Sequence, residues 1–151
     1  MKVLFASDGG KQSDSAIGAL KLLALKKGDE IKIISVVDMA LPMTIDIYGG
    51  YLPNTTELEK TARENASRTL SDTTGKLKEF ADAGGIQLSS EVLFGSPDSR
   101  IVETAEEWNA DLIVVGSHGY SRWERLLLGS VSDSVVHHAP CSVFVVRTVS
   151  E

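Results

Sequence analysis

The sequence predicts an α/β fold in which a parallel β-sheet carries helices on both faces. Short apolar runs alternate with segments of helical periodicity along the 151 residues, the order that parallel strands and crossover helices produce. The strand-like runs are almost uninterrupted in their apolar character, as in strands that are buried on both faces. Glycines and serines follow the fourth of these runs, at the position where such sheets bind ligands.

The first half of the chain predicts two strands and two helices. Strands are expected at residues 3–6 and 31–37, and the second is rich in β-branched residues. The apolar positions that recur at helical spacing between them are Ile17, Leu20, Leu23 and Ala24. We expect Ser13 to cap this helix and Gly28 to end it. A long helix is expected at residues 57–83, with an apolar stripe made of Leu58, Ala62, Ala66, Leu70, Leu77 and Ala81.

The second half predicts three strands and two helices. The strands are expected at residues 86–94, 112–115 and 142–147. Residues 96–98, with the sequence Ser-Pro-Asp, supply a cap, a proline for the first turn and an acid near the positive end of the helix dipole. The buried face of that helix is expected to consist of Ile101, Ala105 and Trp108. A last helix is expected at residues 131–136, where Ser130 and Asp133 can form a capping box.

Residues 39–56 do not fit this alternation. The segment is long for a loop and unusually apolar, with Ile45, Ile47, Tyr48 and Tyr51 among its residues. Loops of this length are usually functional or mobile. A lid over a ligand, a contact with a partner and a loop folded against its own domain are all compatible with this composition.

Composition excludes several classes of protein. The chain is long enough for one domain over residues 1–151. Its net charge of −6 disfavours general binding to nucleic acid. Cys141 is the single cysteine, so no internal disulfide can form, which suits the cytosol. The first apolar run is too short for a signal peptide, and no run is long enough to cross a membrane. We therefore expect a cytoplasmic protein with no membrane contact.

The glycines after the fourth strand have the spacing of a phosphate-binding motif. Gly116 and Gly119 are separated by two residues, and after nine further residues Gly129 and Ser130 open the last helix. Glycine lets the backbone approach an anion closely, and a helix N-terminus offers unpaired N–H groups and a positive dipole end. The alternative is a glycine-rich turn that only reverses the chain direction, but Gly129 lies far from that turn and still opens a helix.

Polar residues end two further strands. Asp8 follows the first strand, and Asp38 follows the second. Because the carboxyl ends of parallel strands meet at one edge of the sheet, these residues should converge with Gly116. Asp8 can accept hydrogen bonds from a ribose or an adenine amine, or it can bond to its own turn; convergence with the glycines favours the ligand.

These residues resemble the universal stress protein family, and specifically its ATP-binding branch. The resemblance extends over the whole chain and rests on the first strand with Asp8, the second strand ending at residues 36–38, and residues 110–119, 126–132 and 138–141. It implies a three-layer, Rossmann-like domain of the adenine nucleotide alpha-hydrolase type. Its five parallel strands would have the order 3-2-1-4-5.

The resemblance also implies a nucleotide site. Asp8 and the backbone of Val37 would hold the adenosine end of ATP. The remaining positions implied for nucleotide binding are Val115, Gly116, His118, Gly119, Gly129, Ser130, Val131 and Ser132. Gly129, Ser130 and Ser132 would bind the phosphates, together with Mg²⁺ or Mn²⁺. His118 stands where other members often carry Arg, which could weaken contacts to the distal phosphates.

The favoured function is an ATP-binding regulatory or stress-response module. Gly9-Gly10-Lys11 is not a P-loop, because its four-residue spacer and second glycine are missing, and no water-positioning residue is evident. His118, His137 and His138 lack metal-ligand spacing. A slow ATP hydrolase or phosphoryl-transfer enzyme is the alternative, and a scaffold that binds no nucleotide is a third interpretation. Preference among ATP, ADP, AMP and cyclic nucleotides stays open.

The last strand predicts a homodimer. Residues 143–146 are apolar at four successive positions, so both faces of this strand are apolar. In the implied order it is an edge strand, and an exposed edge is a hazard unless it is paired or shielded. Antiparallel pairing with a second copy across a two-fold axis would close it. A monomer whose edge is blunted by Arg147 and the short tail is the alternative.

Overall fold

The computed structural model describes residues 1–39, 55–117 and 128–147. The strands are β1 (Lys2–Ala6), β2 (Glu30–Asp38), β3 (Gln87–Gly95), β4 (Leu112–Gly116) and β5 (Ser142–Val146). The helices are α1 (Lys11–Leu22), α2 (Thr55–Gly84), α3 (Pro97–Trp108) and α4 (Ser130–His138). Every strand expected from the apolar runs is present, displaced by at most one residue at either end.

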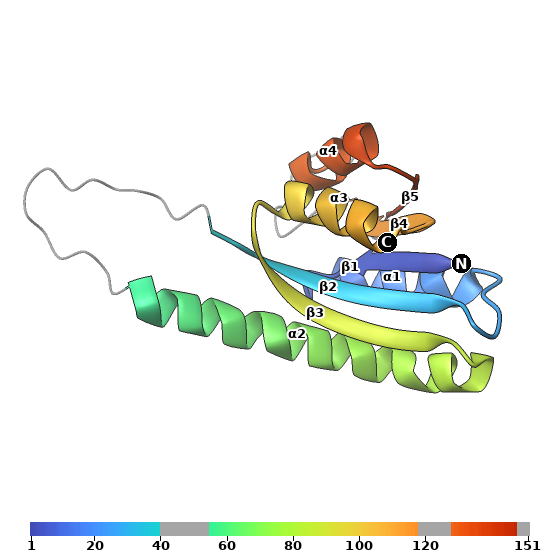
Figure 1. Cartoon of the computed structure of the whole chain (residues 1–151). Helices are drawn as coiled ribbons and strands as arrows, with labels where there is room; N and C mark the ends of the chain where they lie inside the picture. The colour runs from blue at the N-terminus through green and yellow to red at the C-terminus, as the bar shows by residue number, and fades with distance from the viewer. Residues whose placement is uncertain (40–54, 118–127, 148–151) are drawn as a thin grey trace, which may run out of the picture.

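The strands form one parallel sheet in the order β3-β2-β1-β4-β5 (Figure 1). β1 lies at the centre and pairs with β2 on one side and with β4 on the other. The predicted order 3-2-1-4-5 is therefore confirmed. The chain leaves β1 toward β2 and later returns to the opposite side of β1 with β4, so the topological switch point lies between β1 and β4.

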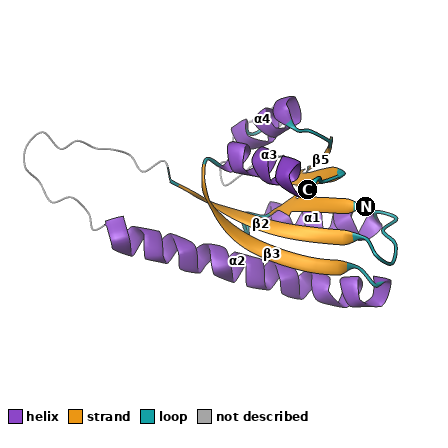
Figure 2. Ribbon diagram, viewed as in Figure 1, coloured by secondary structure: helices purple, strands orange, loops and turns teal. Residues whose placement is uncertain are grey.

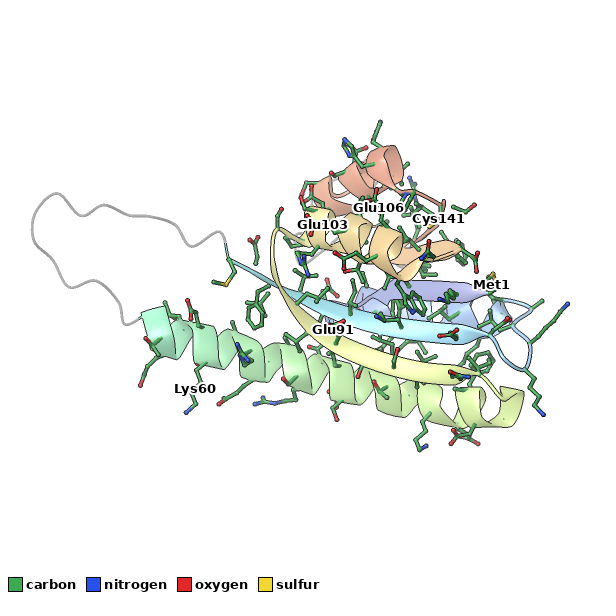
Figure 3. The ribbon with its side chains drawn as sticks, in the orientation of Figure 1. Met1, Lys60, Glu91, Glu103, Glu106 and Cys141 are labelled. Carbon is green, nitrogen blue, oxygen red and sulfur yellow. The ribbon has the colours of Figure 1, made fainter. Side chains whose placement is uncertain are left out.

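Two helices cover each face of the sheet (Figure 2). One core cluster joins the sheet to α1 and α2 through residues such as Leu20 and Leu77. The other joins it to α3 and α4 through Ile101, Ala105 and Val135. The expected buried positions Ile101 and Ala105 are confirmed, since both are at most 3% exposed. Charged side chains such as Lys60, Glu103 and Glu106 lie on the outer helix faces (Figure 3).

Helix α1 begins earlier and ends earlier than the sequence predicted. Gly10 occupies the cap position, and Ser13 is the third helical residue, so the expected cap at Ser13 is wrong. The helix ends at Leu22, and Gly28 lies in the following turn, so the expected end is wrong as well. Gly10 can cap because its extended backbone leaves its carbonyl to accept the Ser13 N–H at 2.9 Å.

Helix α2 has 30 residues, and its C-terminal part lies against the sheet. Leu70 and Leu77 of the predicted stripe are buried, whereas Leu58 is 49% exposed. Figure 1 gives the reason, because the first turns of α2 extend past the carboxyl ends of the strands, where no strand lies against them. Most of the apolar segment predicted at residues 39–56 lies outside the described residues.

Helices α3 and α4 begin after different kinds of residue, a serine before α3 and a glycine before α4. Pro97 is the first residue of α3, as predicted, and Ser96 precedes it. Gly129 precedes α4, whose first residue is Ser130, so the expected capping box is absent. The Asp133 N–H instead bonds to the carbonyl of Gly129 at 2.9 Å. Within the described ranges, no helix is long and apolar enough to cross a membrane.

Candidate functional site

A cavity of about 320 Å³ opens at the carboxyl ends of β1 and β4. It lies at the switch point of the sheet, where folds of this kind bind ligands. Its lining residues come from β1, β2, β4, α1, α3 and α4: Phe5, Ala6, Ser7, Asp8, Ser13, Ala16, Ile34, Val36, Pro97, Ile101, Val115, Gly116, Gly129, Ser130, Val131 and Ser132. The volume is at the lower end of the range typical of small-molecule sites.

The buried lining of the cavity is mostly apolar, with Ser7, Ser13 and Ser132 as its buried polar residues. Phe5 and Ile34 are fully buried, and Val115 is 3% exposed. Asp8 and Ser130 are exposed at the rim, and the first turn of α4 lies beside them. The cavity therefore suits a ligand with one apolar, ring-like part and one anionic part.

The N-terminus of α4 presents backbone N–H groups at the cavity. The N–H groups of Ser130, Val131 and Ser132 lie in its first turn, where N–H groups have no acceptor within the helix. Such groups favour a phosphate, and the helix dipole adds to the effect. The Gly129 N–H, by contrast, donates to the carbonyl of Ser117 at 2.7 Å. Ser130, Val131 and Ser132 are thus placed to offer their amides to a ligand. The hydrogen bond of Gly129 fixes the turn that precedes α4.

Gly129 is not required for its backbone conformation. Its φ of −62° and ψ of 156° are open to any residue. What glycine provides here is the absence of a side chain at the cavity wall. A branched side chain at this position would occupy space beside the free amides of α4.

The Ser132 hydroxyl is used within the protein. The residue is 3% exposed, and its Oγ donates to the carbonyls of Ser117 and Gly129, each at 3.0 Å. The hydroxyl has one proton, which is shared between the two carbonyls, so Ser132 ties the start of α4 to Ser117, the residue after β4. Its backbone N–H remains in the first turn of the helix.

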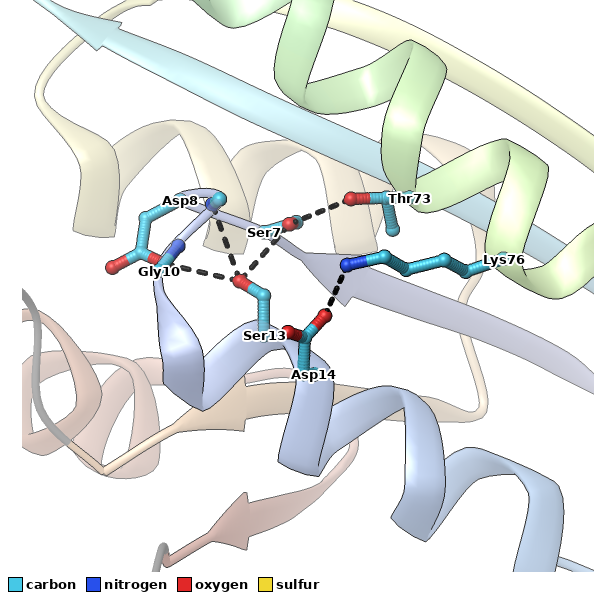
Figure 4. A network of polar contacts seen from close by, with 8 residues as sticks. Ser7, Asp8, Gly10, Ser13, Asp14, Thr73 and Lys76 are labelled. Carbon is cyan, nitrogen blue, oxygen red and sulfur yellow. Dashed lines mark hydrogen bonds and ion pairs between the residues drawn. The ribbon is translucent and has the colours of Figure 1, made fainter.

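Asp8 lies at the rim in a turn that also lines the cavity. Its Oδ1 accepts the Gly10 N–H at 2.9 Å and the Ser13 hydroxyl at 3.0 Å (Figure 4). The turn depends on Gly9, whose φ of 77° lies in the region that side chains disfavour. The carboxylate therefore bonds to its own turn, as one interpretation of Asp8 expected, and Asp8 also lines the cavity.

The other predicted site residues are distributed unevenly. Val115, Gly116 and the residues at the start of α4 line the cavity. Val37 does not line it within the described part of the chain, but its neighbour Val36 does, because successive strand residues face opposite sides of the sheet. His118 and Gly119 lie outside the described residues.

Comparison with known proteins identifies the family. A family model described as "Universal stress protein family" matches residues 1–147. A putative universal stress protein of Staphylococcus aureus (strain USA300) is 34% identical over 148 residues, covering 97% of this chain and 83% of that protein. The chain belongs to the universal stress protein family. The expectation of that family from the sequence is confirmed.

Two solved structures share the fold of this universal stress protein. One is a universal stress protein in complex with cAMP, with a TM-score of 0.60, 24% identity and coverage of 98% of this chain and 97% of that one. The other is a universal stress protein family protein of Arabidopsis thaliana with AMP bound, with a TM-score of 0.69, 16% identity and coverage of 99% and 93%. At these identities the likeness establishes the fold.

Sequence reasoning missed several cavity residues of this universal stress protein. Ser7 and Ser13 line the cavity from the end of β1 and from α1. Pro97 and Ile101 line it from the first turns of α3. A usable signal was the three-residue spacing of Ser13 and Ala16, which places both on one face of a helix that starts at the sheet edge.

Cys141 is remote from the cavity chemistry. It directly precedes β5, at the amino end of the sheet, whereas the cavity lies at the carboxyl ends. Burial raises the pKa of its thiol, and Asp111 raises it further. The side chain is therefore a neutral, partly buried thiol at neutral pH.

Asp98 connects the two helices on the cavity side of the sheet. Its carboxylate accepts the Ser96 hydroxyl at 2.6 Å and the Ser134 hydroxyl at 2.7 Å. The bond from Ser96, and after it the bond from Ser134, holds the pKa of Asp98 below its usual value. Ser134 lies on α4, one turn beyond its first residue, so Asp98 anchors α4 to the start of α3.

This anchor predicts a pH-dependent contribution to stability. Because the folded-state pKa of Asp98 is depressed, its contribution is fully present above the unfolded-state value of about 3.9 and is lost as pH falls through the folded value. We expect Asp98→Asn to lower the free energy of unfolding by about 1 kcal/mol at pH 7. In urea unfolding, this difference should shrink below pH 4. Ser134→Ala should cause a smaller loss, and a pH-independent difference for Asp98→Asn would contradict the assignment.

Proposed function

We propose that this protein binds an adenine nucleotide, ATP in particular, in the cavity between β1, β4 and α4, and acts as a nucleotide-dependent regulatory or stress-response module. The observation that carries the proposal is the combination of an apolar cavity with the free first-turn amides of α4 at its mouth. The apolar part suits a base, and the amides suit phosphates.

The proposed roles follow the position of each residue. Asp8 would accept hydrogen bonds from the adenosine end, with the backbone of β2 near Val37 beside it. Val115 and Gly116 would border the ribose, and the amides of Ser130, Val131 and Ser132 would hold phosphate oxygens. His118 and Gly119 would complete the motif. These roles fit a cavity wall where Gly116 and Gly129 present no side chain.

The nucleotide complexes of two proteins with this fold support an adenine base. Their ligands are cAMP and AMP. We favour ATP here because Gly116, Gly119, Gly129 and Ser130 have the spacing of the ATP-binding branch that the sequence resembles. Mg²⁺ or Mn²⁺ would be held chiefly by the phosphates, which is the common way proteins bind magnesium. In the described ranges, no cluster of three His, Cys, Asp or Glu side chains could hold a metal ion by itself.

Titration calorimetry of the purified protein tests this function. ATP should bind, and saturating ATP should stabilise the fold by about 2.7 kcal/mol at a hundredfold excess over its dissociation constant. Nucleotide released on denaturing the freshly purified protein should identify the preferred ligand among ATP, ADP, AMP and cyclic nucleotides. A nucleotide-free protein that neither binds ATP nor gains thermal stability from it would favour the scaffold interpretation.

Bound ATP is expected to turn over slowly or not at all. Hydrolysis needs an oriented water and neutralisation of charge at the terminal phosphate, and Asp8 lies at the end assigned to adenosine. Phosphate release with Mg²⁺ should therefore stay well below about 1 s⁻¹. Release at about 1 s⁻¹ or faster that disappears in a Gly129→Val variant would overturn this expectation and favour an ATP hydrolase or phosphoryl-transfer enzyme.

We also propose that the protein is a homodimer paired through β5. β5 is an edge strand of the sheet, and Phe144 on it is 37% exposed. Antiparallel pairing of two β5 strands across a two-fold axis would pair the backbone N–H and C=O groups of this edge and bury the Phe144 side chain.

A further inference from the structure

Three buried hydroxyl groups from three different elements meet behind the Asp8 turn. Ser7 follows β1, Ser13 lies in α1 and Thr73 lies in α2. Their exposed fractions are 2%, 7% and 3%. Figure 4 shows them in a row that ends at Asp8. Thr73 is the member that does not line the cavity described above.

The direction of each hydrogen bond in this row follows from counting protons. An ionised carboxylate only accepts, so the Ser13 hydroxyl must donate to Asp8 Oδ1, at 3.0 Å. With its proton used, Ser13 accepts from the Ser7 hydroxyl at 3.1 Å. Ser7 has then spent its own proton, so the Thr73 hydroxyl donates to Ser7, also at 3.1 Å. All three protons point toward Asp8, and hydrogen bonds aligned in this way polarise one another.

Helix α2 also supports the Asp8 turn sterically. A Cβ at Gly9 would lie 2.6 Å from Oγ1 of Thr69, so α2 packs directly on this turn. Thr69 and Thr73 are four residues apart and share one face of α2. The ion pair between Lys76 and Asp14 joins the same stretch of α2 to α1. The turn is therefore held between two helices.

We infer that Thr73 is a positioning residue of the nucleotide site, acting on the Asp8 carboxylate through the hydroxyls of Ser7 and Ser13. The inference rests on the proposed function and extends it to a helix outside the cavity lining. The ligand group concerned is a donor at the adenosine end, a ribose hydroxyl or an adenine amine. The chain of hydroxyls fixes the carboxylate, so such a donor meets an oriented acceptor.

Matched variants of adjacent threonines test the inference. Thr73→Val keeps the shape of the side chain and removes the donor, and should weaken adenosine and ATP binding by the same factor, about threefold to tenfold. Thr73→Ser restores the hydroxyl and should restore both affinities. Thr74→Val is the control, because the Thr74 hydroxyl is buried without a hydrogen-bond partner in the described structure. It should leave both affinities unchanged.

Equal affinities for a folded Thr73→Val variant and the wild type would overturn the inference, as would an equal loss in Thr74→Val. A readout without ligand separates this result from failure of the proposed function. In a double-mutant cycle of Thr73→Val with Asp8→Ala, the effects on the unfolding equilibrium constant should be non-additive by at least about twofold. If the wild type binds neither adenosine nor ATP, the proposed function fails, while coupling in the cycle still supports the chain of hydroxyls and additive effects refute it.

Discussion

Replacing Gly129 with valine is expected to lower ATP affinity by about tenfold to a hundredfold while the fold persists. The backbone angles at Gly129 are open to any residue, so the substitution adds no backbone strain. The added methyl groups would lie at the cavity wall beside the first-turn amides of α4. Phosphate would then be kept from the donors that hold it, because each charge-assisted hydrogen bond needs close approach.

A second glycine provides the control for this measurement. Gly75 lies in α2, and a Cβ there would contact nothing within 4 Å. Gly75→Val should therefore leave ATP affinity unchanged in calorimetry. Adenosine affinity should fall less than ATP affinity in Gly129→Val, because adenosine lacks the phosphates. Wild-type ATP affinity in a folded Gly129→Val protein would refute the amide site at α4.

The protein is expected to sediment as a dimer at micromolar concentration, and Phe144→Lys is expected to convert it into a monomer. Phe144 lies on the edge strand β5 and is 37% exposed, so its ring is available to a second copy. A lysine on an edge strand opposes pairing, because two like charges would face each other across the two-fold axis.

Two further variants make the dimer experiment specific. Val145 packs partly against the core on the side of α3 and α4, so Val145→Lys should cost stability as well as association. Leu22 is 87% exposed at the end of α1, and Leu22→Lys should leave the dimer intact. A wild type that sediments as a monomer, or a Phe144→Lys variant that remains a dimer, would exclude the interface at β5.

The strands and their alternation with helices could be predicted from sequence because they depend on local apolar patterns. The run at residues 112–115 and the β-branched run at residues 31–37 are apolar at nearly every position, which only burial on both faces explains. Parallel strands then bring their carboxyl ends together. The meeting of Asp8 with Gly116 at one cavity follows from that rule, whereas Asp38, which was expected to join them, is not among the described residues that line the cavity.

The helix ends could not be predicted as well, because several residues compete for each cap. Ser13 and Ser130 both have good capping side chains, but glycines take the cap positions of α1 and α4. The Ser13 hydroxyl is bound to Asp8 instead. A hydroxyl has one proton and donates it to the best acceptor within reach. Tertiary packing, and not the position of the residue in the chain, decides which acceptor that is.

The sequence by itself determined the sheet, the edge at which its functional residues gather, and the spacing of the glycine motif. Tertiary structure alone decided which groups remain available there. The Gly129 N–H and the Ser132 hydroxyl both bond to Ser117, so the groups left to offer hydrogen bonds to a ligand are the first-turn amides of α4. Thr73, distant in sequence, supports Asp8 through two hydroxyls. The reason is physical: apolar periodicity is local, whereas a hydrogen bond between elements exists only once their packing brings donor and acceptor within about 3 Å.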